Sequence, residues 1–520
     1  MNSFTVFLRK NLVLWITLLV LLALFIAAAR GMETKDWVIT LLRSLSVGSV
    51  TFLVASGFSL IFGLLDVLNL AHGTLFMIGA YIGWTVYIRP DTFVDLLTPL
   101  ALLVSGFALG SVWQVLSTRI QLPGRLNRIT PWLGLFVAVL ILLFVLPRYP
   151  ISSWNLENYA EGPVTYSFLA DRGQRILPPA KGFEDISPLT ALGGLLFASL
   201  LGAFSLSAFG SRNAQPATLR FNWRQFVLFG VLLAIGLGAL AANDALTATL
   251  TGFSTTALFF IAVLIATLSG VGLGALMEST LIRPLYSRPI YNLMLTLGLS
   301  AIGIEMVRAV WGRPEFVMPR PALFNGTGEG CPATSLAGWV QNHCSTILLF
   351  DGRVRVYNEI FIPIVGIVVL IAVWMLLQRS RLGMIIRAGV QDREMVEALG
   401  INIRRVFTMV FAMGVGLAAL GGVLAAPSMG LSNSMGEFLL LNALIAMAIG
   451  GLTSYPGAAI GSLLVGLLQQ FIIKYGQIGI QIPFTEIIFK PTPPLVPAST
   501  VLLMVIILLL LPNGLFGKKE

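Results

Sequence analysis

Three polar side chains, Asp66, Asn69 and His72, interrupt a long apolar stretch near the start of the chain, and Gly73 follows them directly. A polar group at membrane depth is costly unless it faces a cavity or a polar partner. Asn69 and His72 would share one helix face, and Gly73 would permit a break that exposes backbone groups. These four residues are therefore candidates for lining a solute path. The alternative is that Asp66 and Asn69 end one helix at the membrane surface and His72 caps the next.

The hydrophilic segment 379–405 could bind a partner protein through a short surface helix. Asp392 suits the N-cap of this helix, and Gly400 suits the position after its end. One face would carry Met395, Val396 and Leu399, and the other faces would carry the charged Arg393, Glu394 and Glu397. Such a helix presents an apolar strip either to a protein or to the lipid headgroups, and the two glutamates favour a protein.

The chain has only two cysteines, Cys331 and Cys344, and both lie in the polar segment 312–359. They do not form the CxxC pairs of a zinc or redox site, so we expect no metal centre. On the oxidising side of a bacterial membrane they could form a disulfide, and two free thiols are the alternative.

Common motifs for catalysis and nucleotide binding are missing from the sequence. It has no GxxxxGK[ST] phosphate loop, no HExxH and no GxSxG, and it contains only two histidines. We therefore expect no enzyme activity and no cofactor in this chain, and an ATP-driven transporter built on it would need a partner ATPase. The alternative is transport driven by an ion gradient through the carboxylates of Asp66, Glu278 or Glu305.

The elements that must position these residues are membrane-spanning helices. Of the 520 residues, 57% are hydrophobic and 11% are charged, and the mean hydropathy is +0.89; an ordinary globular domain has about 25% charged residues. We predict an all-α polytopic bundle of about 14 spans. They lie near 12–29, 38–64, 73–88, 96–117, 132–147, 189–209, 226–242, 254–282, 290–311, 360–378, 405–426, 437–452, 456–473 and 498–513.

Charge distribution predicts the orientation of these spans. Arginine and lysine gather in loops on one side, including the arginines between Arg379 and Arg405, whereas the opposite loops are net acidic. Because positively charged loops stay in the cytoplasm, both termini are predicted to be cytoplasmic, and the longer loops 148–188 and 312–359 are predicted to face outward. Topology thus explains the net charge of +10, and we expect no nucleic-acid partner.

Four segments carry a resemblance to a known family. They are LIFGLLDVLNLAHGTLFMIGAY at Leu60–Tyr81, MESTLIRPLYSRP at Met277–Pro289, RAGVQDREMVEALGIN at Arg387–Asn402 and AIGGLTSYPGAAIGSLLVG at Ala448–Gly466. In this order they resemble the permeases of the branched-chain amino acid ABC importer family, which also includes urea and amide importers. With their apolar surroundings they cover about 40–90 and 255–515, well over half of the chain.

This resemblance implies that Arg387–Asn402 is a cytoplasmic coupling loop, which docks on an ATPase. The residues expected to make that contact are Arg387, Asp392, Arg393, Glu394, Glu397, Ala398, Leu399 and Gly400. It also implies two ATPase subunits, a second related permease subunit and a periplasmic or lipid-anchored solute-binding protein, in the plasma (inner) membrane of a bacterium. Each of these partners would be a separate chain.

The chain departs from the usual family pattern at 90–252, where four additional spans with an outward loop at 148–188 are predicted. We therefore divide the chain into a first part of the permease core at 1–89, an inserted region at 90–252, and a second part of the core at 253–520. The scarcity of charges within the spans suits a small neutral or zwitterionic solute. Branched-chain and other amino acids, urea and short amides all remain open.

Overall fold

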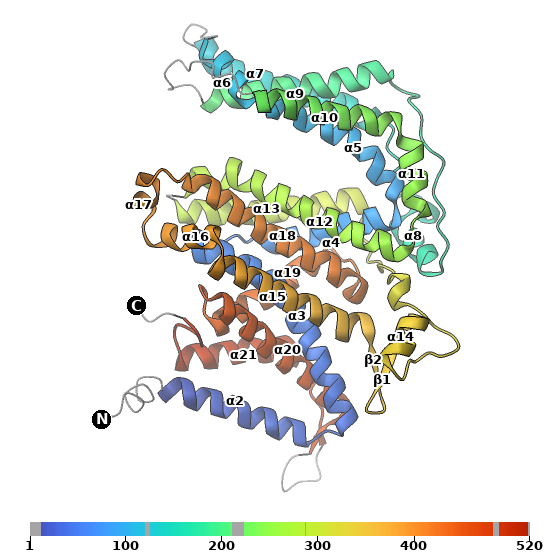
Figure 1. Ribbon diagram of the computed structural model, residues 1–520, viewed down its shortest axis with the longest axis vertical. Coiled ribbons are helices and arrows are strands. Elements are labelled where there is room, and N and C mark those ends of the chain that lie inside the picture. Colours follow the sequence, from blue (N-terminus) through green and yellow to red (C-terminus); the bar gives the residue numbers. More distant parts are fainter. Residues whose placement is uncertain (1–11, 120–124, 211–222, 287, 482–487, 518–520) are drawn as a thin grey trace. The chain divides into compact units, whose positions relative to one another are not determined.

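A computed structural model describes residues 12–119, 125–210, 223–286, 288–481 and 488–517 of the protein, which are mostly helical (Figure 1). The chain divides into two compact units. Unit 1 consists of Met1–Trp84, Leu156–Gln174 and Thr255–Glu520, and unit 2 consists of Thr85–Asn155 and Arg175–Ser254. The chain therefore leaves unit 1 twice and returns to it twice.

Unit 1 begins with the helices α2 (Leu12–Arg30), α3 (Thr34–Leu65) and α4 (His72–Ile88), of which α4 continues into unit 2. Helix α3 ends at Asp66, where the backbone is left-handed (φ 53°) and the N–H bonds to the carbonyl of Phe62. Backbone groups in a bilayer must be satisfied within the protein. In the short break that follows, the side-chain oxygen of Asn69 accepts a hydrogen bond from the backbone N–H of Ala71 at 3.1 Å.

Other helices of unit 1 follow the return of the chain from unit 2. The α-helices are α8 (Pro163–Asp171), α12 (Thr255–Met277), α13 (Pro289–Trp311), α14 (Leu336–Asn342), α15 (Ile362–Arg379), α16 (Arg381–Gln391), α17 (Arg393–Ala398), α18 (Ile403–Met429), α19 (Met435–Gly450), α20 (Tyr455–Ile478) and α21 (Leu495–Leu510). Short 3₁₀ turns are η3 (Tyr159–Glu161), η5 (Arg283–Leu285) and η6 (Ala322–Phe324), and π-helical turns are η4 (Glu278–Ile282) and η7 (Val356–Phe361).

Two small antiparallel sheets complete unit 1. Strand β1 (Thr346–Leu349) pairs with β2 (Gly352–Arg355), and β3 (Ile480–Gln481) pairs with β4 (Ile488–Phe489). A two-residue turn joins β1 to β2, and both of its residues, Phe350 and Asp351, have positive φ, as a tight hairpin requires. Figure 1 shows this hairpin and α14 on the side of unit 1 opposite to α16 and α17.

Residues 156–174 belong to unit 1 although the sequence places them inside the predicted insertion. They form η3 and α8 within the segment expected to be an outward loop. Trp84, at the point where the chain leaves unit 1, is fully buried, and its Nε1 donates a hydrogen bond of 2.8 Å to Oγ of Ser167 in α8. This bond ties the end of the first part of unit 1 to α8.

Unit 2 is a separate helical body. Its α-helices are α5 (Pro90–Ser105), α6 (Gly110–Arg119), α7 (Arg125–Val145), α9 (Pro188–Gly210), α10 (Trp223–Ala241) and α11 (Asn243–Gly252), and its 3₁₀ turns are η1 (Gly106–Leu109) and η2 (Leu146–Arg148). An apolar cluster that includes Leu102, Val145 and Leu195 joins α5, α7 and α9.

The described residues contain eleven helices that are long and apolar enough to cross a membrane, which supports an all-α polytopic membrane protein. Helices α4, α19 and α21, of 17, 16 and 16 residues, coincide with three further predicted spans. The finer predictions of about 14 spans and two cytoplasmic termini stay predictions.

Helices α3 and α18 form the centre of unit 1. In their most apolar stretches, 72% of α3 and 78% of α18 are buried, compared with 6% of α2. Small residues allow neighbouring backbones to approach α18 closely. At Gly422, for example, a Cβ would clash with the carbonyl oxygen of Phe76 in α4.

Candidate functional site

The predicted solute-path residues lie at the break between α3 and α4. Asp66 is exposed and ends α3, whereas Asn69 and His72 are fully buried. Nε2 of His72 lies 3.1 Å from the carbonyl oxygen of Val54 in α3, and Gly73 packs against the backbone of Gly436 in α19. None of these residues lines either of the two polar cavities described below. Their role in solute transfer stays a prediction.

A polar cavity of about 440 Å³ lies instead among α3, η7, α18, α19 and α20 of unit 1. We call it the Arg43 cavity. Its polar wall consists of Arg43, Ser46, Thr51, Arg355, Asn358, Glu359, Ser428, Asn442, Gln469 and Gln470, and its apolar wall consists of Val47, Val50, Ile362, Ala425, Met429, Phe438 and Leu439. Ligand sites for small molecules are commonly cavities of about 300–1,000 Å³ with apolar walls and a few placed polar groups.

An ion pair lies at the edge of the Arg43 cavity. Nε of Arg43 donates to Oε1 of Glu359 at 2.8 Å, and the backbone N–H of Arg355 donates to Oε2 of the same carboxylate at 2.7 Å. Glu359 is only 2% exposed, whereas the side chain of Arg43 is 42% exposed. The guanidinium therefore remains accessible to an anionic group, whereas both oxygens of the buried carboxylate are already hydrogen-bonded.

Uncharged polar groups line the rest of this cavity. Nε2 of Gln469 in α20 donates to Oδ1 of Asn442 in α19 at 3.1 Å, and both residues are buried. Oγ of Ser428 donates to Oδ1 of Asn358 at 2.9 Å. Together with the ion pair, these groups can bind a small solute that carries hydrogen-bonding groups at one end and an apolar group at the other.

Arg43 and Glu359 were not among the predicted site residues. Arg43 nevertheless carried a sequence signal, because it is a charge within the predicted span 38–64 and an ionisable residue in a span indicates a functional site. Glu359 lies just before the predicted span 360–378 and carried no such signal. The two residues are 316 positions apart, so only the fold brings them together.

The predicted coupling segment forms α16 and α17. Asp392 caps α17, since its Oδ1 accepts a hydrogen bond from the backbone N–H of Met395 at 2.9 Å, and Gly400 follows the helix with φ +79°. Val396 is buried, whereas Met395 and Leu399 are 60% and 72% exposed. The apolar strip is therefore divided between an inward residue and two outward ones.

The other predicted coupling residues lie around this strip. Glu394, Glu397 and Ala398 are exposed. Arg387 in α16 donates a hydrogen bond to the carbonyl of Leu377 in α15. The side chain of Arg393 lies outside the described residues. Whether these residues contact an ATPase stays a prediction.

The three carboxylates that were considered for transport driven by an ion gradient do not share a cavity. Glu278 is fully buried and is paired with Arg283 at 2.7 Å, and Glu305 is 65% exposed and is paired with Arg308 at 2.5 Å. Neither residue, nor Asp66, lines one of the two polar cavities. Transport driven by an ion gradient stays an alternative.

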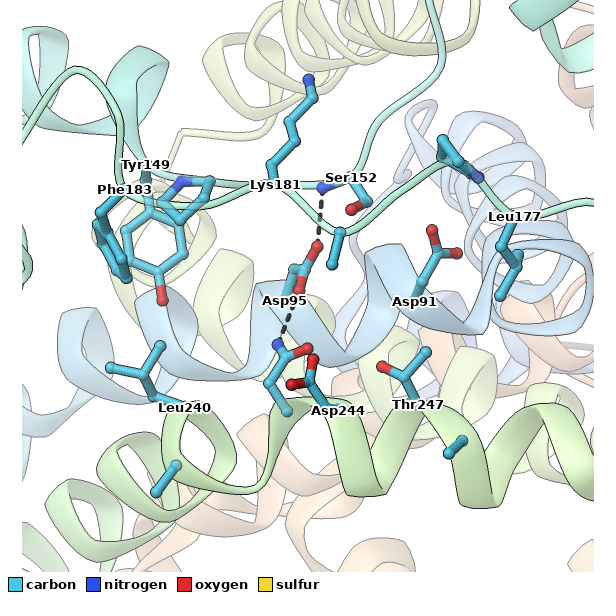
Figure 2. Close-up of a pocket in the computed structure, with 16 residues that line it drawn as sticks. Asp91, Asp95, Tyr149, Ser152, Leu177, Lys181, Phe183, Leu240, Asp244 and Thr247 are labelled. Carbon is cyan, nitrogen blue, oxygen red and sulfur yellow. Dashed lines mark hydrogen bonds between the residues drawn. The ribbon is translucent and has the colours of Figure 1, made fainter.

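A second polar cavity, of about 410 Å³, lies within unit 2 (Figure 2). Asp95 joins three segments there, because its Oδ2 accepts from the backbone N–H of Ser152 and its Oδ1 accepts from Nδ2 of Asn243, both at 2.7 Å. Asp244 follows Asn243 in α11 and also lines the cavity, and Figure 2 shows Lys181 extending away from Asp95. Burial raises the pKa of Tyr149, another wall residue, so its hydroxyl stays neutral.

The two cysteines are joined in a disulfide, with their Cα atoms 5.5 Å apart. The loop that the bond closes contains α14. The backbone of Gly326 pairs with that of Cys344 beside it. Among the described residues there is no group of histidine, cysteine and acidic side chains suited to a metal ion.

Comparisons with known proteins agree with the transmembrane architecture. Residues 40–177 and 189–512 match the family model described as the permease component of the branched-chain amino acid transport system. The high-affinity branched-chain amino acid transport permease LivH of Escherichia coli is 28% identical over 240 residues, covering 45% of this chain and 68% of LivH.

Two further relatives extend this comparison. The permease BraD of Pseudomonas aeruginosa is 36% identical over 122 residues, covering 23% of this chain and 40% of BraD. The galactofuranose transporter permease YtfT of Escherichia coli is 27% identical over 208 residues, covering 38% of this chain and 57% of YtfT. No solved structure matches the chain.

Proposed function

Because the chain belongs to the family of branched-chain amino acid transport permeases, we propose that it is the membrane-spanning subunit of an ABC importer for an amino acid. Solute would cross unit 1 by alternating access, and partner ATPases would hydrolyse the ATP. The observation that carries this proposal is the Arg43 cavity, a polar cavity between the most buried helices of the bundle.

The chemistry of the cavity supports a zwitterionic solute. The accessible guanidinium of Arg43 suits a carboxylate, and the amide oxygens of Asn358 and Asn442 on the same wall can accept hydrogen bonds from an ammonium group. Val47, Val50 and Phe438 offer an apolar surface to a side chain. An amino acid with an apolar side chain would use both parts of the wall.

The exposed part of α17 supports a docking surface for an ATPase. Met395 and Leu399 project an apolar strip beside the exposed Glu394 and Glu397, and their mixed character favours a protein partner over lipid. In the predicted orientation this surface is cytoplasmic, where ATP is available. A solute-binding protein and a second permease subunit complete the proposed importer.

A short amide or urea is the second candidate solute. The amide pair of Asn442 and Gln469 favours it, because amide groups can donate and accept hydrogen bonds to a neutral solute without any charge. Such a solute would not need Arg43.

Reconstitution of the chain into proteoliposomes with its ATPases, second permease and binding protein tests the proposal. We expect uptake of radiolabelled leucine that requires ATP and is lost when the ATPases are omitted. Uptake by the purified chain alone, insensitive to ATP and abolished by collapse of an ion gradient, would contradict it and support a secondary transporter. ATP-dependent uptake of urea or acetamide that leucine does not inhibit would identify the second candidate solute instead.

A further inference from the structure

Glu278 lies at the end of α12, in the π-helical turn η4, and is fully buried. Its Oε1 accepts hydrogen bonds from the hydroxyl of Tyr286 at 2.7 Å and from Nε of Arg283 at 3.2 Å. Its Oε2 accepts from Nη2 of Arg283 and from Oγ1 of Thr408, both at 2.7 Å. Every donor except Thr408 comes from the segment that immediately follows α12.

Thr408 lies in the second turn of α18, the helix that follows the coupling segment. Nη2 of Arg283 also donates to Thr408 at 2.6 Å, so the carboxylate and the guanidinium both hold the same hydroxyl. The ring of Tyr286 packs edge to face against Phe407, with the centroids 6.3 Å apart. Polar and aromatic contacts thus join the end of α12 to the start of α18.

An apolar cluster extends this connection to α17. It includes Val396, the inward residue of α17, together with Ile403 and Phe407 of α18 and Met277 and Ile282 at the end of α12. Displacement of α17 would therefore press on the two helix ends that the Glu278 carboxylate joins. Short π-helical turns within α-helices are frequent at functional sites.

A buried carboxylate is stable only when it is paired with a cation and its oxygens are hydrogen-bonded. Its partners must therefore keep their positions around it. The hydrogen bonds of Glu278 and Arg283 to Thr408 therefore resist separation of α12 from α18. We infer that Glu278 is a positioning residue for transport, which makes the ends of α12 and α18 move together when the coupling segment is displaced. This inference rests on the proposed function.

The test compares ATP hydrolysis with solute uptake in proteoliposomes that contain the complete importer. In Glu278→Gln the charge is removed while the size is kept, and the apolar cluster that seats α17 remains. We expect leucine uptake to fall at least tenfold while ATP hydrolysis stays within threefold of the unmodified importer. A role in folding alone would lower both rates together.

Thr408→Val gives an independent variant, because it removes the hydroxyl that links the carboxylate to α18 and leaves the pair of Glu278 and Arg283 intact. We expect a smaller increase in ATP hydrolysed per leucine imported, and no additional increase when both substitutions are combined. The matched control is Ser279→Ala, since the exposed Ser279 hydroxyl bonds only within its own helix, to the carbonyls of Ala275 and Leu276.

An unchanged ratio of hydrolysis to uptake in Thr408→Val overturns the inference, and so do parallel losses of both rates in the two variants. If the importer that carries Glu278→Gln does not assemble, the ratio of hydrolysis to uptake in Thr408→Val decides the inference. Failure of the unmodified importer to take up solute with ATP would instead refute the proposed function, and the inference with it.

Discussion

Replacing Arg43 with glutamine removes one of the two arginine side chains on the wall of the Arg43 cavity, the other being Arg355, and leaves the buried Glu359 carboxylate with the N–H of Arg355. A hydrogen bond to a charged group contributes about 1.5–3 kcal/mol, and about 1.4 kcal/mol corresponds to a tenfold change in an equilibrium constant. Because the Arg43 side chain is 42% exposed, solvent screening favours the lower end of this range. We expect solute occupancy of the cavity to fall roughly tenfold.

The maximal rate of uptake reports this loss best. In the proposed importer a separate binding protein captures the solute, so the KM for uptake reflects that protein and should stay within about twofold of the unmodified value. The maximal rate of leucine uptake should fall by about tenfold in Arg43→Gln, in proportion to the occupancy of the cavity. Initial rates in proteoliposomes over a range of leucine concentrations measure both quantities.

A matched control separates the cavity from general loss of charge. Arg308→Gln also removes an arginine from an ion pair on a long helix, but Arg308 is not one of the residues that line the cavity, and it pairs with the exposed Glu305. It should leave the maximal rate unchanged. A normal maximal rate in Arg43→Gln, at equal abundance in the membrane, would refute the assignment of a zwitterion to this cavity.

Other substitutions test separate parts of the structure. Gly400→Asp places a Cβ at φ +79° beside the exposed strip of α17, so ATP-dependent uptake should be lost while membrane insertion, followed by quantitative blotting of membranes, stays normal. Asp95→Asn weakens the hydrogen bonds to Ser152 and Asn243 and should destabilise unit 2 by about 1–3 kcal/mol. Limited proteolysis should then cleave faster within 85–155 and 175–254, and cleavage rates equal to those of the unmodified protein would contradict this. Gly422→Val forces a side chain against the Phe76 carbonyl and should lower the thermal unfolding temperature of the purified protein, whereas Gly238→Val, where a Cβ meets open space, should not.

Many elements could be predicted because their causes are local. The predicted spans fall on helices, since an apolar run must satisfy its own backbone groups in a bilayer, but the span 96–117 crosses the 3₁₀ turn η1 between α5 and α6. The N-cap at Asp392 and the positive φ at Gly400 followed from residue type in the same way. These features depend on a few neighbouring residues and not on the tertiary structure.

The candidate site depends on contacts between distant segments and could not be predicted from the sequence. Arg43 and Glu359 come from α3 and η7, and Asn442 and Gln469 come from α19 and α20. The polar residues that the sequence emphasised, Asn69 and His72, are buried where the chain passes from α3 to α4. A polar residue in an apolar segment signals an unusual environment, but the sequence does not say whether that environment is a cavity or a helix end.

The hydrogen bond between Trp84 and Ser167 matters for anyone who wishes to shorten this protein. A deletion of 90–252, guided by the usual length of the family, would remove Ser167 and α8 together with unit 2 and would leave the buried indole without its acceptor. A minimal permease should instead keep residues 156–174 and connect them by linkers to Trp84 and Thr255. Unit 2 therefore has to be excised as two separate pieces of chain.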